Sequence, residues 1–468
     1  MNENRFFSPD LTIRSIAHQL YNSSKNLPIF SPHGHVDPSL FSNPDASFGN
    51  PVDLFIKPDH YILRMLYTNG LSLEEFGVSP RGKSIKIDKR KIWQLFGEKF
   101  YLFRGTPSGI WLSTSFKDVF GIEKKLSKET ANFVYDRLVE KLTSTEFSPR
   151  KLYERFNIEF LATTDSPADS LKHHQIIQGS NWKATIVPTF RFDSLVHLQN
   201  PIWFDEIQRL ALLSNTDIKD FKSFIRAIEV RRKDFKSLGA TATDFSAETA
   251  VAQDMSPNEV EMVFQRALQG KADQEDADRF VAHMLMEMAR MSTEDGLVMQ
   301  FHAGIYRNHN RVLYEKFGSD IGGDIPLSVE FTKSLLPLLQ KFGNEKKFQL
   351  ILFTLDEATY TRELAPLAGH YPAVKLGAPW WFNDSINGIT RYLNQVIETA
   401  GLYKTAGFND DTRGFCSIPA RHDLWRRMAA NWLAELLVRH IIDEEDAHQM
   451  MFDLVVGLAH KAYKWEMG

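Results

Sequence analysis

Eight short apolar segments, each followed at once by polar or charged residues, constrain the fold of this chain more than any other feature. Stretches with the spacing of amphipathic helices separate most of them. Strands that alternate with helices run parallel, and eight such units close a barrel whose chemistry lies at the carboxyl ends of the strands. The pattern therefore predicts the α/β class and a (β/α)8 TIM barrel. The predicted strands are 27–30, 158–162, 184–187, 238–242, 297–301, 348–353, 373–376 and 406–408.

Helical patterns fill the gaps between these strands. Two of them begin with a serine and a proline, Ser166-Pro167 and Ser256-Pro257, which suit the N-cap and the first position of a helix. After the last strand, residues 423–466 predict two helices that cover the outside of the barrel. The other amphipathic patterns are 203–236, 257–292, 326–341, 357–368 and 385–400.

The connection after the first strand is too long for a single helix and is rich in aromatic side chains, among them Trp93 and Trp111. We expect residues 41–149 to form a mostly helical insertion near the barrel mouth. Residues 1–40 and 150–468 then form the barrel that carries the active site. A chain of 468 residues suits this arrangement, because barrels of about 250 residues commonly carry insertions.

Composition excludes several classes of partner. The 55 basic and 59 acidic residues give a net charge of −4, whereas a nucleic-acid surface needs a basic excess. No run of about 18 apolar residues is present, so no membrane span is expected. The single cysteine, Cys416, fits a reducing compartment, and the first residues lack the pattern of a signal peptide. We expect a cytoplasmic enzyme that forms a homo-oligomer.

The sharpest local motif is His33-Gly34-His35, at the end of the first strand. Residues i and i+2 of a strand point to the same side, so both imidazoles can reach one metal ion. Asp411 follows the eighth strand, which lies beside the first in a barrel, and can complete the shell. Two histidines and one aspartate suit zinc or another first-row divalent ion. His302, after the fifth strand, is either a fourth ligand or an acid–base group.

Arginines also follow three of the strands, at Arg191, Arg307 and Arg413. A guanidinium binds a carboxylate in a bidentate manner, so these arginines favour an anionic substrate. The alternative is structural pairing with Asp244, Asp356 or Asp411.

Aromatic side chains offer two further site candidates. Tyr61, which follows His60, can act as a proton shuttle if an arginine lowers its pKa; otherwise it is a core aromatic. Of Trp380 and Trp381, one can stack on a sugar ring while the other packs in the core.

Five ordered motifs together resemble the uronate (glucuronate) isomerase family, a branch of the amidohydrolase superfamily. The resemblance runs from about residue 28 to the C-terminal helices, and residues 355–370 are especially close to family sequence. The motifs are His33-Gly34-His35, Thr163-Thr164-Asp165-Ser166-Pro167, Phe301-His302 with Arg307-Asn308, Trp380-Trp381-Phe382 and Asp411-Thr412-Arg413.

The resemblance implies that the chain interconverts D-glucuronate with D-fructuronate and D-galacturonate with D-tagaturonate. It also implies a distorted barrel, the helical insertion and one divalent metal. By motif position it places His33, His35 and Asp411 around the metal. The residues that it places in the substrate site are His60, Tyr61, Arg191, Asp244, His302, Arg307, a tryptophan of the 380–381 pair and Arg413.

An aldose–ketose isomerase opens the sugar ring and moves a proton from C2 to C1 through a cis-enediol. We expect Asp244 with His33 or His302 to assist ring opening. For the proton transfer the candidates are Asp411, beside a metal that acts as a Lewis acid, or Tyr61 with its pKa lowered by Arg307. In the second case, which we favour, the metal only clamps the substrate.

Two features set this chain apart from possible relatives. Phe245 stands where most of the family is expected to carry histidine, which would alter ring opening or sugar preference if that position touches substrate.

A mononuclear metal-dependent hydrolase of the amidohydrolase type is the alternative function. It is disfavoured because 243–244 and 356–357 lack the strand-four lysine or glutamate and the strand-six histidine of hydrolytic relatives. A sugar-acid binding protein is disfavoured because the catalytic positions are present.

Overall fold

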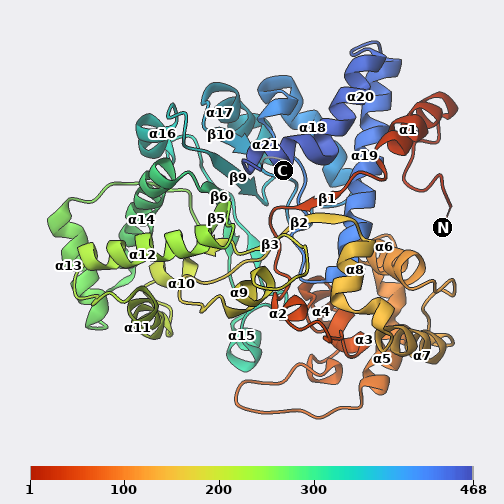
Figure 1. Cartoon of the computed structure of the whole chain (residues 1–468), viewed down its shortest axis with the longest axis horizontal. Coiled ribbons are helices and arrows are strands. Elements are labelled where there is room, and N and C mark those ends of the chain that lie inside the picture. Colours follow the sequence, from red (N-terminus) through yellow and green to blue (C-terminus); the bar gives the residue numbers. More distant parts are fainter. Residues whose placement is uncertain (1, 466–468) are drawn as a thin grey trace.

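The computed structural model describes residues 2–465, which form two parallel sheets surrounded by helices (Figure 1). The first sheet has the order β1-β2-β3, and the second has the order β10-β9-β6-β5-β4. The strands are β1 (Ile29–Ser31), β2 (Ile158–Ala162), β3 (Ile186–Val187), β4 (Phe190–Arg191), β5 (Ala242–Ala247), β6 (Val298–Ala303), β9 (Leu350–Thr354) and β10 (Val374–Leu376). The α/β class and the parallel arrangement are thus confirmed.

Short contacts join the edges of the two sheets. A parallel bridge pairs Asp165, after β2, with Phe190 in β4, and a second pairs Leu376 in β10 with Thr405. On the far side, the backbone N–H of His35 donates to the carbonyl of Thr412 at 2.9 Å. The segment after Thr405 therefore lies between β10 and the loop that follows β1.

The predicted eighth strand, 406–408, is wrong as a strand: Thr405, just before it, forms the isolated bridge to β10, and within 406–408 the N–H of Ala406 donates to the carbonyl of Leu376 at 2.8 Å without a ladder. Gly407 has a φ of +74°, and a Cβ there would lie 2.7 Å from the backbone nitrogen of Ala459. Residues 406–408 thus pass close to the C-terminal helix α21 (Leu458–Ala462) instead of pairing as a regular strand.

Several strands lie later in the sequence than predicted. Leu238, the first residue of the predicted fourth strand, is the C-cap of helix α12 (Phe221–Ser237), and Gly239, with a φ of +90°, turns the chain into β5. Asp244 therefore lies inside β5, and His302 inside β6, rather than after them. The predicted strand 184–187 forms only β3, and β4, which carries Arg191, is a separate strand.

The helix signals were right where the side chains cap as expected. Ser256 accepts from the N–H of Glu259 in α13 (Pro257–Leu268), and Glu259 bonds back to Ser256. Pattern 385–400 corresponds to α18 (Ile386–Ala400), and pattern 257–292 is divided between α13 and α14 (Gln274–Asp295). Pattern 203–236 is likewise divided between α11 (Trp203–Ser214) and α12.

Two helix predictions were wrong. Ser166 begins only a turn, in which its hydroxyl accepts from the N–H of Ala168 at 3.1 Å while donating to Glu206 at 2.8 Å, and α9 (Lys172–Gln178) starts later. Most of 326–341 is not helical: α16 covers Leu336–Phe342, and β8 (Ile325–Pro326) pairs with β7 (Ile305–Tyr306) in an antiparallel hairpin. Pattern 357–368 forms a π-helical turn, Tyr360–Leu364, followed by α17 (Ala365–His370).

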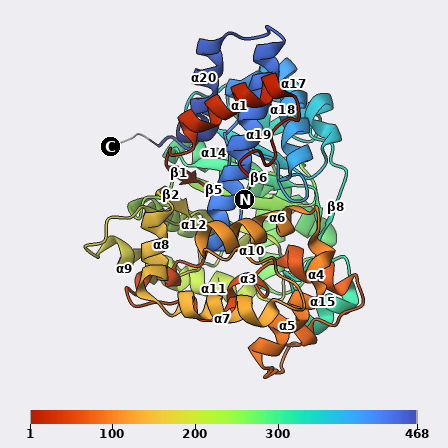
Figure 2. The same cartoon turned by 90° about the vertical axis from the view of Figure 1, so that its right-hand side faces the viewer.

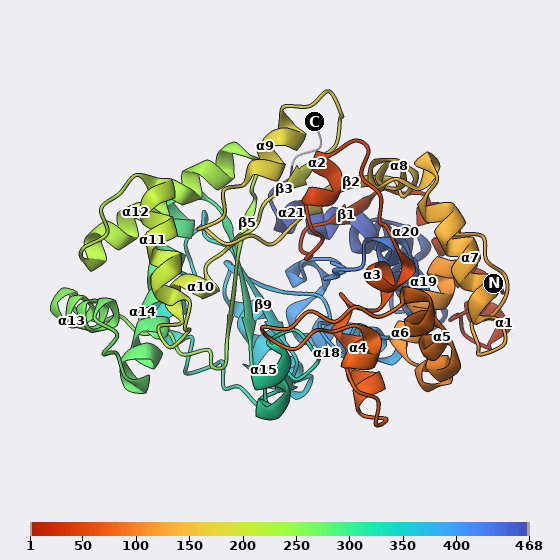
Figure 3. The same cartoon turned by 90° about the horizontal axis from the view of Figure 1, so that it is seen from below.

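The range 41–149 is mostly helical and lies to one side of the sheets (Figure 3). Its aromatic side chains, with Trp93 and Phe96 fully buried, belong to a hydrophobic core that also includes Ile29, Ile158 and Ile186 from the first sheet. Its longer helices are α3 (Pro51–Phe55), α4 (His60–Tyr67), α5 (Lys89–Lys99), α6 (Pro107–Thr114) and α7 (Ala131–Leu142).

The C-terminal helices cover the outside of the sheets, where α1 (Leu11–Ser24) packs against α19 (Ile418–Val438) and α20 (Glu444–Phe452) (Figure 2). In the described part of the chain, no helix is long and apolar enough to cross a lipid bilayer. The remaining helices are α2 (Ser39–Ser42), α8 (Pro149–Arg155), α10 (Asp193–Val196) and α15 (Arg311–Phe317).

Candidate active site

A cavity of about 490 Å³ opens at the carboxyl ends of the strands, beside the helical range 41–149. This volume falls in the range of small-molecule sites. Every site residue predicted from the sequence lines it: His33, His35, His60, Tyr61, Arg191, Asp244, His302, Arg307, Trp380, Trp381, Asp411 and Arg413.

His33, His35 and Asp411 form a group that can hold a metal ion, since one ligand atom from each lies within 4.8 Å of the others. Asp411 Oδ1 is 3.5 Å from His33 Nε2 and 3.1 Å from His35 Nε2. Burial lowers the pKa of His33 to about 4, so this imidazole is neutral and able to coordinate. Although burial opposes it, the hydrogen bond from His35 holds the pKa of Asp411 well below its usual range. The donor set therefore fits a divalent cation.

The backbone around these three side chains is held by its own contacts. Asp411 adopts a left-handed φ of +38°, which non-glycine residues rarely do. The hydroxyl of Thr164 donates to the carbonyl of Gly34 at 2.8 Å, and His35 is tied to Thr412 as described above. His422, from α19, lies 3.1 Å from the neighbouring Asp410. These contacts bring the histidine motif and the Asp411 loop together.

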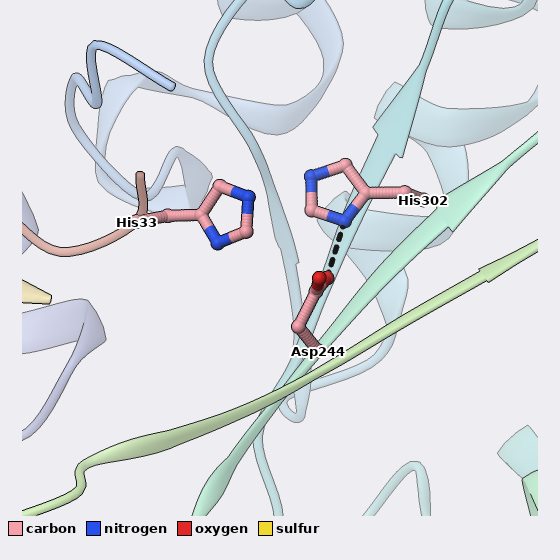
Figure 4. A group of neighbouring side chains, drawn as sticks. All are labelled: His33, Asp244 and His302. Carbon is pink, nitrogen blue, oxygen red and sulfur yellow. Dashed lines mark hydrogen bonds and ion pairs between the residues drawn. The ribbon is translucent and has the colours of Figure 1, made fainter. Parts of the chain in front are cut away.

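His302 and Asp244 are a buried pair of side chains that lie next to His33, so His33 belongs to both groups (Figure 4). His302 Nδ1 lies 2.7 Å from Asp244 Oδ1, while its Nε2 is buried without a hydrogen-bond partner in the described residues. Burial raises the pKa of Asp244, but the charges of His302 and Arg191 hold it well below its usual range. An ionised Asp244 accepts the Nδ1 hydrogen and leaves Nε2 as the basic atom.

The three arginines each face a carboxylate. Arg191 lies 3.3 Å from Asp244, which is one of the structural pairings considered from the sequence, and 3.0 Å from Asp193. Arg307 and Arg413 do not pair with Asp356 or Asp411: their partners are Asp324 at 2.8 Å and Asp320 at 3.1 Å. The hydroxyl of Ser246 accepts from Arg191 at 3.4 Å and from Arg307 at 3.1 Å, so it links two of the guanidinium groups.

Tyr61 differs from the expected arginine-activated phenol. Its hydroxyl faces Asp384, at 3.2 and 3.3 Å from the two carboxylate oxygens, while Arg307 is bound to Asp324 and Ser246. Burial and the nearby negative charge of Asp384 raise the pKa of Tyr61 well above its usual value. The prediction that Arg307 lowers this pKa is therefore wrong.

The two neighbouring tryptophans lie differently in the cavity wall. Trp380 is buried and packs on His302, with ring centroids 4.5 Å apart. Trp381 is half-buried and lies beneath the Arg307 guanidinium, 5.3 Å from its ring centroid, and beside His60.

Phe245 does not line the cavity. It is fully buried between Phe192 and Phe301, with ring centroids 4.6 and 5.8 Å away. Neighbouring residues of a strand point to opposite faces, so Asp244 faces the cavity and Phe245 faces the helices. The condition under which Phe245 would change sugar preference, contact with substrate, is not met.

Sequence reasoning missed several polar residues of this site. Asp193 and Asp384 stand two to four residues after a predicted site residue, and that proximity was the available signal. Arg421, from α19, had no such signal, because only the folded chain brings it to the cavity. The missed residues are Asp193, Ser246, Asp320, Asp324, Asp384 and Arg421.

Comparison with known proteins decides the family. The glucuronate isomerase family model matches residues 4–463. The uronate isomerase of Nostoc punctiforme is 52% identical over 464 residues, which cover 99% of this chain and 98% of the relative. The chain belongs to the glucuronate isomerase family. The resemblance found in the sequence is thus confirmed, and so is its prediction that the chain is an enzyme, a uronate isomerase.

Solved structures agree with this assignment. The crystal structure of glucuronate isomerase from Caulobacter crescentus matches with a TM-score of 0.98 and 45% identity, over 100% of this chain and 98% of that one. Uronate isomerase from Thermotoga maritima matches with a TM-score of 0.92 and 25% identity, over 99% of both chains. The fold described above is therefore that of uronate isomerases.

Proposed function

We propose that this enzyme interconverts D-glucuronate with D-fructuronate, and D-galacturonate with D-tagaturonate, through a cis-enediol. The observation that carries the proposal is that every metal-site and substrate-site residue predicted from the family resemblance lines one cavity. Each cavity arginine uses only part of its five N–H donors on aspartates, so donors remain for the substrate carboxylate.

We infer that the two sheets are arcs of a distorted (β/α)8 barrel. The bridges Asp165–Phe190 and Leu376–Thr405, and the hydrogen bond from His35 to Thr412, support closure at both gaps. Large barrels often self-associate, and we expect a homo-oligomer, which sedimentation velocity would measure.

His33, His35 and Asp411 would hold one divalent ion, zinc or another first-row metal. When bound, such an ion supplies either a clamp for the C6 carboxylate and C5 hydroxyl or Lewis-acid polarisation at C1 and O2. This assignment also decides which of His33 and His302 assists ring opening. With His33 assigned to the metal, His302 is the histidine left for acid–base work.

Ring opening requires a proton to leave the anomeric hydroxyl and another to reach the ring oxygen. His302 Nε2, whose ring is oriented by Asp244 and packed against Phe353 at 4.1 Å, takes the first of these protons. The buried charge of Asp244 then stabilises the imidazolium. The same group returns the proton to the ring oxygen.

Isomerisation then moves hydrogen between two carbons. A base takes the C2 hydrogen as a proton, its bonding electrons form the C1=C2 double bond of the cis-enediol, and the proton returns to C1. A proton also passes from O2 to O1. Asp411 and Tyr61 are the candidate bases, and Tyr61 needs an acceptor for its own phenolic hydrogen if it is to serve.

Conversion of both sugars, followed by NMR in D2O, tests the function. We expect the wild type to form the keto acids, and Asp411→Asn to lose at least about 100-fold in turnover. A hydrolase would instead release a new acid group. Absence of turnover with either sugar, with or without added zinc or manganese, would reject the proposal.

A further inference from the structure

Asp384 is a buried carboxylate that meets Tyr61 at the cavity wall, and no role above has been given to it. It stands between β10 and α18, whereas Tyr61 comes from α4 and Arg421 from α19. Asp384 accepts from the Tyr61 hydroxyl at 3.2 and 3.3 Å and from Arg421 Nη1 at 3.0 Å. The Asp384 and Arg421 side chains are only 14% and 6% exposed. Three segments that are far apart in the sequence, carrying Tyr61, Asp384 and Arg421, thus meet at the Asp384 carboxylate.

The hydrogen bonds of Tyr61 define which of its atoms remains available. Its hydrogen points to Asp384, and its oxygen accepts from the backbone N–H of Phe382 at 3.3 Å. A phenol oxygen has a second lone pair, and Tyr61 lines the cavity. Tyr61 can therefore accept a proton from a ligand only if it passes its own hydrogen to Asp384.

Arg421 holds Asp384 in place. Its guanidinium lies 3.5 Å from the ring centroid of Trp111 and donates to the carbonyl of Asp410 at 3.2 Å. The carboxylate therefore cannot turn away from Tyr61 without leaving a buried arginine unpaired, which is strongly unfavourable. The Tyr61–Asp384 distances exceed the 2.7–2.8 Å or so of a compact O–H···O bond, but catalytic hydrogen bonds often shorten when substrate binds.

We propose that Asp384 is a positioning residue that acts through Tyr61 and receives the phenolic proton while Tyr61 takes the proton from C2 of the hexuronate. The inference rests on the proposed isomerase function. In the step, the C2–H bond breaks, its electrons form the C1=C2 double bond of the enediol, and the π electrons of the C1=O bond move to O1, which takes the proton that leaves O2. A new O–H bond forms at Tyr61, its former O–H bond breaks, and that proton joins the Asp384 carboxylate. The reverse movement delivers a proton to C1, so no charged phenolate forms.

The electrostatics of the pair support this direction of transfer. Burial raises the pKa of Asp384 to about 6, against the charge of Arg421, so the carboxylate is ionised at neutral pH yet able to take a proton. The titratable or charged groups that act on it are Tyr61, Arg421 and, through charge alone, Asp411.

Asp384→Asn tests the relay, because an amide keeps the shape and can accept a hydrogen bond but cannot hold the proton. We expect kcat to fall by about 100-fold or more, with KM within about threefold of wild type. Tyr61→Phe should lose a similar factor, and the double variant should lose no more than either single variant, since both act in one step. Asp384→Glu should recover part of kcat and shift the acidic limb of its pH profile.

A matched control is Asp295→Asn, which also removes the carboxylate that pairs with a buried arginine. Asp295 pairs with Arg232 at 2.6 Å, at the end of α14 and before β6 begins, away from the cavity. This variant should lose thermal stability and keep its kcat.

A folded Asp384→Asn with kcat within about threefold of wild type would overturn the relay, and so would losses that multiply in the double variant. If Asp384→Asn does not fold, an unchanged acidic limb in Asp384→Glu overturns it instead. A wild type that converts neither sugar would reject the proposed function itself, a result distinct from these.

Discussion

Replacing Asp244 by asparagine should remove turnover while leaving the affinity for hexuronate nearly unchanged. Asp244 is 1% exposed, and its two oxygens face His302 Nδ1 at 2.7 Å and Arg191 Nη1 at 3.3 Å. The amide preserves this shape but removes the negative charge that stabilises a protonated His302. Arg191 keeps its contact with Asp193 at 3.0 Å and should stay in position.

The magnitude of this loss follows from the acid–base role of the pair. Loss of general acid–base catalysis lowers a rate by about 10²–10⁴-fold, which at about 1.4 kcal/mol per tenfold is roughly 3–5 kcal/mol. We therefore expect kcat to fall by about 10²–10⁴-fold in Asp244→Asn.

Initial rates over a range of hexuronate concentrations would separate kcat from KM. Asp193→Asn is the control, because it takes the other carboxylate from Arg191 but leaves the Asp244–His302 pair intact. It should raise KM and keep most of kcat. If Asp244→Asn also raised only KM, Asp244 would be a counter-ion of Arg191 and the acid–base reasoning would be refuted.

Three further predictions concern the metal, the core and pH. His33→Ala should lower the bound divalent metal, measured by elemental analysis, to a small fraction of that in wild type; full retention would contradict the assigned ligands. Phe245→Leu should leave the ratio of kcat/KM for the two sugars unchanged, since the ring packs away from the cavity, and should lower stability by less than the roughly 3–5 kcal/mol of a Phe→Ala truncation. Burial raises the pKa of Asp165 to about 7, so the folded chain binds more protons than the unfolded one between about pH 4 and 7, and stability falls as pH rises through that window. Melting temperatures near pH 5 and pH 8 should differ less in Asp165→Asn than in wild type, and an equal difference would refute this account.

Local signals predicted the parts of the fold that local interactions determine. The serine–proline pair at Ser256 gave a true cap because Glu259 stands three residues later and bonds back to it. The same pair at Ser166 closes only a turn: Asp169 stands where Glu259 follows Ser256, and the serine hydroxyl donates to Glu206, forty residues away. A strand could be recognised from its apolar run, but its bounds depended on distant packing, as at Gly407 against Ala459.

The site residues also divide into those that local signals predict and those that only the folded chain brings together. His33 and Asp411 could be predicted to lie together, because the carboxyl ends of parallel strands meet at one edge. The residues that pair with Arg413, Arg307 and Asp384 could not be predicted, because Asp320, Asp324 and Arg421 come from a loop and a helix with no fixed place relative to that edge. The domain limits at 41–149 stay a prediction, and the hydrophobic core of that range continues into β1, β2 and β3.

Tyr61 shows why the partner of a residue matters more than its presence. Beside Arg307 it would ionise and act as a free base; beside Asp384 it keeps its hydrogen and works only if that hydrogen has somewhere to go. A positive neighbour lowers the pKa of a phenol and a negative one raises it, so one choice of neighbour reverses the chemistry. In this chain the neighbour of Tyr61 is Asp384, which Arg421 holds in place, so in the proposed relay the carboxylate receives the phenolic proton.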